Sequence, residues 1–331
     1  MQTRTLGHQK LKVSAIGLGC MGMSEFYGET NDAESINTLK KAYDLGITFF
    51  DTADMYGSGH NEKLLGQAIG SVRDKVIIAT KCGLVRDPDN AGYRGVNGSA
   101  DYITACCEAS LKRLNLEYID LFYLHRIDPN TPIETSVTAM ANLVKQGKIK
   151  HIGLSEAGAE IIRRAHRIHP ITAIQSEYSL WTRGVEQEVL KVCQELNIGF
   201  VPYSPIGRGF LTGKIQSSQN LAADDFRKNL PRFSEENLNT NLKMVAELTQ
   251  LAQEKGCSTV QLALAWVLAQ GDYIVPIPGT RRVKYLEENV GAVKVHLNAA
   301  DLARIDEICS ANQVAGDRYP TAIMDSFNLS K

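Results

Sequence analysis

Three short apolar stretches of the chain each end in an ionisable side chain, and a tyrosine follows the first of them. The four residues are Asp51, Tyr56, Lys81 and His125. Apolar runs of this length are typical of buried strands, and a carboxylate at the end of such a strand is costly unless it is paired or functional. Because the strand ends of a parallel barrel converge on one rim, we predict that these four side chains meet there.

These side-chain types suit the reduction of a carbonyl group. Hydride from a reduced nicotinamide would attack the carbonyl carbon, and the phenol of Tyr56 would give the oxygen its proton. A free phenol has a pKa of about 10, and the ammonium of a neighbouring Lys81 is expected to lower it. Asp51 would hold Lys81 charged, and His125 would donate a hydrogen bond to the carbonyl oxygen. The alternative is a structural Asp51–Lys81 ion pair, with Tyr56 and His125 as ordinary buried polar groups.

Apolar stretches alternate with helical patterns, and this alternation predicts the elements that position the four groups. The expected strands cover residues 16–19, 47–50, 76–80, 119–124, 151–155, 173–175, 198–203 and 274–277. The expected helices cover roughly residues 32–45, 61–69, 100–114, 133–144, 161–168, 189–196, 240–255, 259–269 and 299–310, with another from near residue 282. Eight strands alternating with helices indicate an α/β protein, a (β/α)₈ TIM barrel. We expect a single domain over 1–331, with an N-terminal β-hairpin closing the bottom of the barrel, extra C-terminal helices and long rim loops.

Two polar stretches are expected to be loops on the active rim. Residues 84–98 contain Gly and Asp without periodicity, which favours a loop, and residues 207–239 form a longer excursion of the kind used for lids or binding loops. Aromatic residues that would line a substrate pocket, or equally well pack or lie on the surface, are Phe26, Tyr27, Tyr93 and Trp181. Residues 131–134, which lie between these two loops in the sequence, predict a helix start, with Thr131 as the N-cap and a proline in the first turn.

Length, composition and charge narrow the class of protein. The chain has 331 residues, 44% of them hydrophobic and 22% charged; this is ordinary for a soluble globular protein, and a barrel of about 250 residues plus decorations fits the length. The 36 basic and 37 acidic residues leave a net charge of −1, so nothing argues for nucleic acid or a membrane as partner. We expect a small-molecule carbonyl substrate and a monomer or weak homo-oligomer.

The N-terminus and the cysteines favour a cytoplasmic location. The first residues open no secretory apolar segment, and the longest apolar run, residues 262–269, is too short to span a bilayer. The seven cysteines show no C-x-x-C pattern, and their odd number does not suit a secreted disulfide framework. Reduced thiols are therefore expected.

The chain also resembles the aldo-keto reductases along nearly its whole length. The motifs that carry the resemblance are, in order, GITFFDTADMYG (46–57), ATK (79–81), LH (124–125), IGLS (152–155), IQSEY (174–178), VPYSP (201–205) and IPGT (277–280). The resemblance implies that the four residues above form the catalytic tetrad, with the roles already described, and that the cofactor is NADPH/NADP⁺. Residues 155–157 and 177–183 look like the branch that contains pyridoxal reductases and plant alkaloid-aldehyde reductases.

The resemblance further assigns residues to the nicotinamide end of the cofactor. Ser155, Glu156 and Gln175 fall where relatives hold the carboxamide, although many relatives have Asn in place of Glu156. An ionised Glu156 cannot donate to the amide oxygen, so Ser155 or Gln175 would have to; the alternative for Glu156 is a solvated loop acid. The residues expected at the nicotinamide-stacking position and in the pyrophosphate loop after it are Tyr203, Ser204, Pro205, Gly207, Arg208, Gly209 and Leu211. Rim packing is the alternative for Tyr203.

A helix start after the last expected strand is the candidate site for the phosphate that distinguishes NADPH from NADH. Helix N-termini bind phosphate, and arginine suits it. The residues expected there are Gly279, Thr280, Arg281 and Arg282, and the adenine contacts of the family correspond to Glu288 and Asn289. Tyr285 stands where relatives usually carry arginine, so the charge must come from Arg281 or Arg282; the alternative is a solvated basic turn.

Other classes of protein compete with a reductase. An NADPH-binding regulatory or redox-sensing subunit of the same fold, such as the beta subunits of potassium channels, would turn over little; the complete tetrad and the lack of a long N-terminal extension argue against it. A metal-dependent barrel enzyme needs clustered histidine and carboxylate ligands. Only His125 of the seven histidines stands at a clear strand end, so no metal site is expected. No G-x-G-x-x-G follows the first strand, which argues against a Rossmann dehydrogenase.

Overall fold

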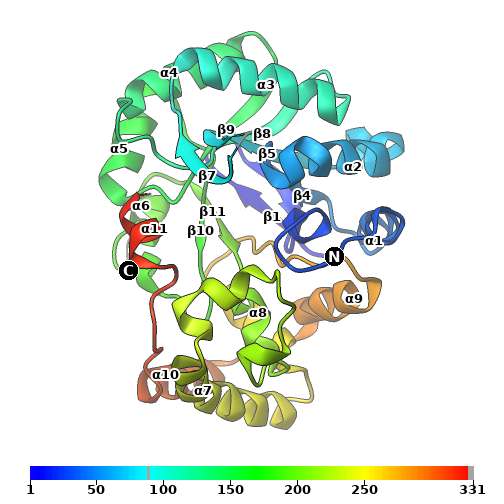
Figure 1. Ribbon diagram of the computed structural model, residues 1–331, viewed down its shortest axis with the longest axis vertical. Coiled ribbons are helices and arrows are strands. Elements are labelled where there is room, and N and C mark those ends of the chain that lie inside the picture. Colours follow the sequence, from blue (N-terminus) through cyan, green and yellow to red (C-terminus); the bar gives the residue numbers. More distant parts are fainter. Residues whose placement is uncertain (88–89, 327–331) are drawn as a thin grey trace.

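The computed structural model describes residues 1–87 and 90–326, and its centre is a parallel sheet curled into a nearly closed barrel (Figure 1). Seven strands in the described residues pair in the order β11-β10-β9-β8-β5-β4-β3, always in parallel. Their bounds are β3 Leu18–Gly19, β4 Phe49–Asp51, β5 Ile77–Cys82, β8 Ile119–Leu124, β9 Ile149–Ser155, β10 Ala173–Glu177 and β11 Gly199–Tyr203. The predicted α/β barrel is thus confirmed.

The eighth barrel position holds an extended segment, residues 274–279, so the prediction of a regular eighth strand was wrong. Ile274 forms an isolated bridge to Phe200 of β11, and Gly279 forms one to Gly19 of β3. The two prolines of the segment have no N–H to donate, so a continuous ladder cannot form. A Cβ at Gly19 would lie 2.8 Å from a backbone oxygen of this segment, so the close approach that closes the barrel requires glycine there.

Helices surround the sheet and bury their apolar faces against the strands or against one another. Their bounds are α1 Asp32–Asp44, α2 His60–Ile69, α3 Ala100–Leu114, α4 Ile133–Lys145, α5 Ala159–Ile168, α6 Val189–Glu195, α7 Glu235–Glu254, α8 Thr259–Ala269, α9 Val283–Gly291, α10 Ala299–Ala311 and α11 Thr321–Ser326. Pro132 occupies the N-cap position of α4, and the Thr131 hydroxyl donates to Asp128 Oδ2 (2.8 Å). The prediction that Thr131 is the N-cap of α4 was therefore wrong, because its hydroxyl donates to Asp128 instead of bonding the helix.

The N-terminal hairpin was predicted correctly and covers the amino-terminal end of the barrel. It consists of β1 (Thr3–Leu6) and β2 (Leu11–Ser14), which pair antiparallel. Leu6 and Val13 belong to the same buried cluster as the side chains that point into the barrel, and Leu6 packs where a Cβ of Gly199 would lie. The bottom of the barrel is thus filled by apolar side chains, which leaves the opposite, carboxyl-terminal end open for chemistry.

Two regions expected to be loops carry more structure than predicted. Residues 84–98 contain an antiparallel hairpin, β6 (Leu84–Asp87) and β7 (Asn90–Val96), because backbone pairing stabilises strands even where side chains show no periodicity; residues 88–89 of this stretch lie outside the described residues. Residues 207–239 contain four 3₁₀ turns. Helix α7 begins five residues before the predicted position because the Ser234 side chain caps it.

The C-terminal part of the chain returns to the open end of the barrel. Helices α7 and α10 lie side by side at the bottom of the view in Figure 1, and the chain then leaves α10 and runs back to α11. On this return path Tyr319 and Ile323 reach the cavity described below. The predicted extra C-terminal helices are present, and they bring residues distant in sequence to the rim.

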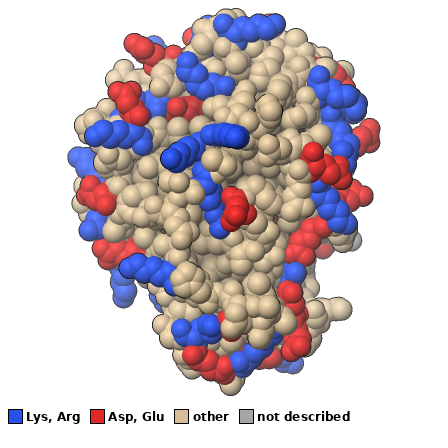
Figure 2. Space-filling model, turned by 180° about the vertical axis from the view of Figure 1, so that it is seen from behind, with Lys and Arg blue, Asp and Glu red and all other residues tan. Residues whose placement is uncertain are grey.

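Charges of both signs are mixed on the face drawn in Figure 2, and the cysteines form no disulfide among the described residues. On the face shown in Figure 2, basic and acidic side chains are interspersed among uncharged ones. In the described part of the chain no helix is both long and apolar enough to cross a membrane. All seven cysteines lie in the described residues and are free thiols.

Candidate active site

Parallel pairing brings the predicted strand-end residues to one rim. Asp51 is the last residue of β4, Lys81 lies next to last in β5, and His125 follows β8. Tyr56 lies in a turn after β4, where Gly57 and Ser58 both have positive φ (54° and 52°). This unusual backbone turns the chain back, and the Tyr56 and His125 rings meet edge to face with centroids 6.0 Å apart.

A buried ammonium connects the acid and the phenol. The Lys81 side chain is 0% exposed, and its Nζ donates to Asp51 Oδ1, to Thr52 O (2.7 Å) and to Tyr56 OH (3.3 Å). The second carboxylate oxygen of Asp51 accepts from Gln175 Nε2 (2.7 Å). Burial raises the pKa of Asp51 overall, while the Lys81 charge and the hydrogen bonds from Lys81 and Gln175 oppose this shift by favouring the carboxylate.

The pKa shifts correct one expectation for this group. Although burial lowers the pKa of Lys81, the Asp51 carboxylate raises it overall, so the amine keeps its proton as predicted. Burial raises the pKa of Tyr56 more than the Lys81 charge lowers it. The predicted net lowering of the Tyr56 pKa was therefore wrong for the protein without bound ligand, and the phenol stays protonated at neutral pH. A proton donor in that state can act as a general acid.

His125 is neutral in this environment. Burial, followed by the charges of Arg126 and Lys81, holds the pKa of His125 well below its usual range. Its Nδ1 is buried and finds no hydrogen-bond partner among the described residues. A neutral imidazole carries one N–H, so His125 can still donate a single hydrogen bond to a carbonyl oxygen.

Three of the four groups, Asp51, Tyr56 and His125, line a cavity of about 550 Å³ at the carboxyl-terminal end of the barrel. Ligand sites of barrel enzymes lie at this end, and the volume is typical of cofactor and substrate pockets. The predicted site residues that line it are Asp51, Tyr56, His125, Ser155, Gln175, Tyr203, Ser204, Pro205, Gly209, Gly279, Thr280, Arg281 and Arg282. Those that do not line it are Lys81, Glu156, Gly207, Leu211, Glu288 and Asn289. Lys81 nevertheless reaches the site through its bond to Tyr56.

The residues after β11 fit the phosphate groups of a dinucleotide. Ser204, Gly207, Arg208 and Gly209 have φ values of 48°, 59°, 56° and 88°, a left-handed backbone that folds the loop into tight turns, in which the N–H groups of Gly207 and Gly209 donate to Ser204 O and Ile206 O. A Cβ at Gly207 would lie 2.6 Å from the Trp181 indole, so glycine is required there. Ser204, Arg208 and Gly209 line the cavity, and a hydroxyl and a guanidinium suit phosphate oxygens. These residues therefore fit a nicotinamide dinucleotide, which when bound would supply a hydride.

The predicted aromatic pocket residues divide into two groups. Phe26 and Tyr27 line the cavity. Trp181 lies behind it, stacked on Phe210 with ring centroids 4.4 Å apart. The side chain of Tyr93 lies outside the described side chains. Packing thus decides which aromatic rings of the rim reach the cavity.

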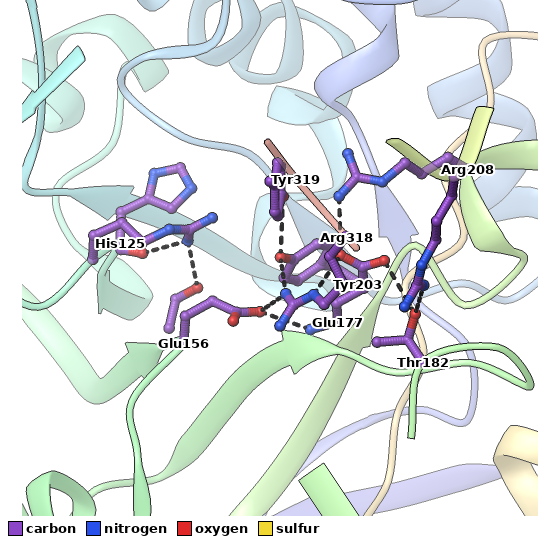
Figure 3. Close-up of polar contacts among 11 residues, drawn as sticks. His125, Glu156, Glu177, Thr182, Tyr203, Arg208, Arg318 and Tyr319 are labelled. Atoms are coloured by element: carbon purple, nitrogen blue, oxygen red, sulfur yellow. Dashed lines mark hydrogen bonds and ion pairs between the residues drawn. The ribbon is translucent and has the colours of Figure 1, made fainter. Parts of the chain in front are cut away.

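Glu156 is engaged by protein groups and does not face the cavity. Its Oε1 accepts from the Glu177 backbone N–H (2.9 Å) and from Arg318 Nη2 (2.8 Å). Figure 3 shows Arg318 between Glu156 and Glu177, with Tyr203 close by. These contacts place Glu156 in a buried ion network rather than in solvent, and its predicted role at the carboxamide stays a prediction.

The two arginines that are candidates for binding the NADPH phosphate have different surroundings. Arg281 Nη1 donates to the backbone oxygens of Tyr27 (3.0 Å) and Gly28 (3.4 Å), so it anchors the loop after β3. Arg282 begins α9 at its N-cap, its side chain is 56% exposed, and its Nε lies 3.8 Å from Glu34 Oε1. Both line the cavity, but Arg282 is the more exposed of the two and its ion pair with Glu34 is long.

Sequence reasoning missed several charged and aromatic residues of the cavity wall. They are Arg126, Arg227, Phe226 and Tyr319. Arg126 directly follows His125 at a strand end, a position that signalled its placement. The others come from loops or from the C-terminal return of the chain, where no period or motif indicates position.

The ion network around Glu177 predicts a pH dependence of stability. Burial raises the pKa of Glu177, but the charges of Arg208, Arg318 and Arg232 outweigh burial and lower this pKa from 4.5 to about 2. A carboxyl group with a lowered folded-state pKa stabilises the fold above its unfolded pKa, and this stabilisation is lost as the pH falls through the folded value. The difference corresponds to on the order of 3 kcal/mol. The free energy of unfolding of the wild type, measured with urea, should therefore fall by that much as the pH is lowered from about 5 to about 2.

The Glu177→Gln variant isolates this contribution. Its free energy of unfolding should fall less steeply over the same acid range, because the titrating group is gone. Glu254→Gln is the matched control, since Glu254 pairs with Arg304 on the surface and exposed pairs contribute little. If the free energy of unfolding falls as steeply toward acid pH in Glu177→Gln as in the wild type, Glu177 is not the group responsible.

Comparison with known proteins agrees with this architecture. A family model described as the aldo/keto reductase family matches residues 15–310. The Glycine max protein named probable aldo-keto reductase 1 is 47% identical over 323 residues, which cover 96% of this chain and 92% of that protein.

Solved structures share the fold over nearly the full length. The glycerol dehydrogenase of Gluconobacter oxydans has a TM-score of 0.84 and 29% identity, covering 96% of this chain and 98% of its own. The holo form of an aldo-keto reductase from Bacillus halodurans has a TM-score of 0.75 and 26% identity, covering 97% and 98%. With a matching family model, a close relative and the barrel itself in agreement, the chain belongs to the aldo/keto reductase family, whose members are oxidoreductases that use nicotinamide cofactors.

Proposed function

We propose that this protein is an NADPH-dependent reductase that converts aldehydes and some ketones to alcohols, with the proton coming from Tyr56. The observation that carries the proposal is the buried Lys81, which bonds Asp51 and Tyr56 at the base of a cavity that Tyr56 and His125 line. In this arrangement Lys81 stabilises the phenolate that Tyr56 becomes as it gives up its proton. His125 orients the carbonyl oxygen toward that phenol.

The cavity wall supports aromatic aldehydes, pyridoxal among them, as substrates. Apolar side chains on one side of the cavity are Met21, Phe26, Met55, Leu84 and Phe226. Such a wall excludes water and packs well against a flat ring. Likeness to the pyridoxal reductase and plant alkaloid-aldehyde reductase branch, carried by residues 155–157 and 177–183, gives the same substrate class.

The test is oxidation of NADPH by the purified protein with a panel of aldehydes that includes pyridoxal, benzaldehyde and short aliphatic aldehydes. We expect aldehyde-dependent turnover, fastest with the aromatic compounds. Tight NADPH binding without turnover of any aldehyde would instead favour a regulatory subunit of the same fold. Failure to bind NADPH would contradict both.

A preference for NADPH over NADH should depend on Arg282. Hydrogen bonds to charged groups contribute about 1.5–3 kcal/mol, so Arg282→Ala should weaken NADPH binding about ten- to a hundred-fold. NADH lacks the phosphate, and its affinity should hardly change. Fluorescence titration of both cofactors measures the two Kd values.

Arg281→Ala serves as the comparison for that experiment. Because Arg281 anchors the loop after β3, its loss should weaken NADPH and NADH binding to a similar degree. If Arg282→Ala keeps wild-type affinity for NADPH, or loses NADH affinity equally, the phosphate is bound elsewhere.

Location, assembly and domain organisation complete the proposal. Seven free thiols support a cytoplasmic location. A monomer or weak homo-oligomer is part of the proposal, and the one face drawn in Figure 2 mixes basic and acidic side chains. The continuous barrel supports a single functional domain over the whole chain.

A further inference from the structure

The turn that carries Tyr56 is anchored at Asp54, two residues before it. The Asp54 N–H donates to the backbone oxygen of Lys81 (3.2 Å), and the Tyr56 N–H donates to that of Ala53 (3.2 Å). Asp54 is not among the described residues that line the cavity. The ionisable neighbours of its side chain belong instead to α2, α3 and β5, which are labelled in Figure 1. Asp54 thus connects the catalytic turn to the helices behind the barrel wall.

The carboxyl group of Asp54 lies in surroundings that do not suit a negative charge. Its Oδ1 is buried and has no hydrogen-bond partner among the described residues. Ionisable groups around it in the described part of the chain are Glu62 of α2, Tyr102, Cys106 and Arg113 of α3, and Cys82 of β5. The cation of this set, Arg113, donates from Nε to Glu62 Oε2 (2.5 Å) and from Nη2 to Ser110 Oγ (3.1 Å). Because Arg113 is already paired with Glu62, an ionised Asp54 would face a second carboxylate.

The balance of these effects keeps Asp54 protonated through mildly acidic pH. Burial and then the charge of Glu62 raise the pKa of Asp54 to about 7, and the charge of Arg113 offsets them only in part. A neutral carboxyl group has no charge to desolvate, whereas a buried carboxylate without a partner is costly. Asp54 is half-buried as a residue, so a small outward movement of the turn brings its carboxylate to water.

We propose that Asp54 is a positioning residue for Tyr56: as a neutral acid it holds the catalytic turn against α2 and α3, and its ionisation releases the turn. The inference rests on the proposed function, because Tyr56 is the proton donor of that reaction. The phenol must stay beside Lys81 Nζ (3.3 Å) and edge to face with His125. A misplacement of about 1 Å can lower a rate about a hundred-fold, so kcat should fall as Asp54 ionises.

The test is the pH dependence of kcat for one aldehyde at saturating NADPH, measured for the wild type and for Asp54→Asn. Asparagine has nearly the same shape and does not ionise. A group with a pKa of about 7 is about nine-tenths protonated at pH 6 and about nine-tenths ionised at pH 8. The ratio of the Asp54→Asn kcat to the wild-type kcat should therefore rise about ten-fold from pH 6 to pH 8. The Kd of NADPH, from fluorescence titration, should be the same for both proteins at each pH.

Two further variants separate the charge of Asp54 from other effects of pH. Asp74→Asn removes an exposed carboxylate, and its kcat should keep a constant ratio to the wild-type value over the same range. Glu62→Gln removes the neighbouring negative charge and releases Arg113. Asp54 should then ionise more easily, so the fall in kcat should begin at a lower pH than in the wild type. A Glu62→Gln profile that coincides with the wild-type profile would overturn the link between the two carboxyl groups.

Stability gives a second measurement that needs no turnover. A carboxyl group with a raised folded-state pKa stabilises the fold below its unfolded pKa, and this contribution is lost as the pH rises through the folded value. The wild type therefore loses the contribution of Asp54 by pH 8, whereas Asp54→Asn has no such loss. Urea denaturation at pH 5 and pH 8 should find that the unfolding midpoint of Asp54→Asn, relative to that of the wild type, is higher at pH 8.

The outcomes distinguish this inference from the proposed function. Turnover with a constant kcat ratio between pH 6 and pH 8, or a difference in unfolding midpoint that does not change with pH, would overturn the role of Asp54 and leave the reductase. No turnover of any aldehyde by the wild type would overturn the proposed function and, with it, the positioning of Tyr56. Should Asp54→Asn fail to fold, Asp54→Ser takes its place in both measurements. A wild-type kcat that does not fall between pH 6 and pH 8 would by itself overturn the inference.

Discussion

Replacement of Tyr56 by phenylalanine should lower kcat for aldehyde reduction about 10²–10⁴-fold, the usual contribution of general acid catalysis. The phenol lines the cavity, accepts from Lys81 Nζ (3.3 Å) and remains protonated at neutral pH because burial raises its pKa. Phenylalanine keeps the ring and its packing but has no proton to give. Steady-state kinetics measure kcat, and fluorescence titration should find NADPH affinity and the fold unchanged.

Tyr319→Phe is the matched control, since Tyr319 is a second tyrosine in the same cavity wall. Its hydroxyl lies 3.4 Å from that of Tyr203, whereas Lys81 Nζ donates to Tyr56. Loss of the Tyr319 hydroxyl should therefore cost less than ten-fold, roughly the effect of one neutral hydrogen bond. Full turnover by Tyr56→Phe would contradict the assignment. An equal loss in both variants would make the effect one of packing.

The second large effect is expected at Lys81. Lys81→Met removes the ammonium that supports Tyr56 and leaves the Asp51 carboxylate buried, with Gln175 as its remaining side-chain donor. Breaking a buried pair from one side costs about 3–5 kcal/mol. We therefore expect both a loss of kcat and a lower free energy of unfolding, measured by urea denaturation.

The double variant tests whether the two charges act as a pair. Asp51→Asn with Lys81→Met should be less destabilising than the sum of the single changes, because neither charge is then left alone. The exposed Glu254–Arg304 pair supplies the control cycle, in which coupling should be near zero. Additive effects at Asp51 and Lys81 would argue against the direct contact.

The placement of the four catalytic candidates followed from the sequence because two local rules act together. Short apolar runs indicate strands, and parallel strands of one barrel end on one rim. Asp51, Lys81 and His125 each stand within a residue of such an end, so their meeting needed no knowledge of side-chain packing. The N-terminal hairpin and most helices followed in the same way from turn residues and helical periodicity.

The cavity wall beyond these residues depended on contacts between distant parts of the chain. Arg318 lies 162 residues from Glu156, yet their side chains form the ion pair that removes Glu156 from the cavity. The position of Tyr319 depends on how the chain returns from α10, and no local pattern encodes that path. The pairing of β6 with β7 depended likewise on backbone hydrogen bonds that side-chain periodicity does not report.

The protonation of the site residues likewise depends partly on the sequence and partly on the fold. The sequence by itself determined which groups are ionisable and which strand ends carry them, because residue type and period are local properties. Only the tertiary structure decided the direction of each pKa, because burial and charge oppose one another and their balance depends on three-dimensional surroundings. For Lys81 the Asp51 charge outweighs burial, whereas for Tyr56 burial outweighs the Lys81 charge. The sequence therefore determined the chemistry available at the rim, and the fold decided which groups hold their protons there.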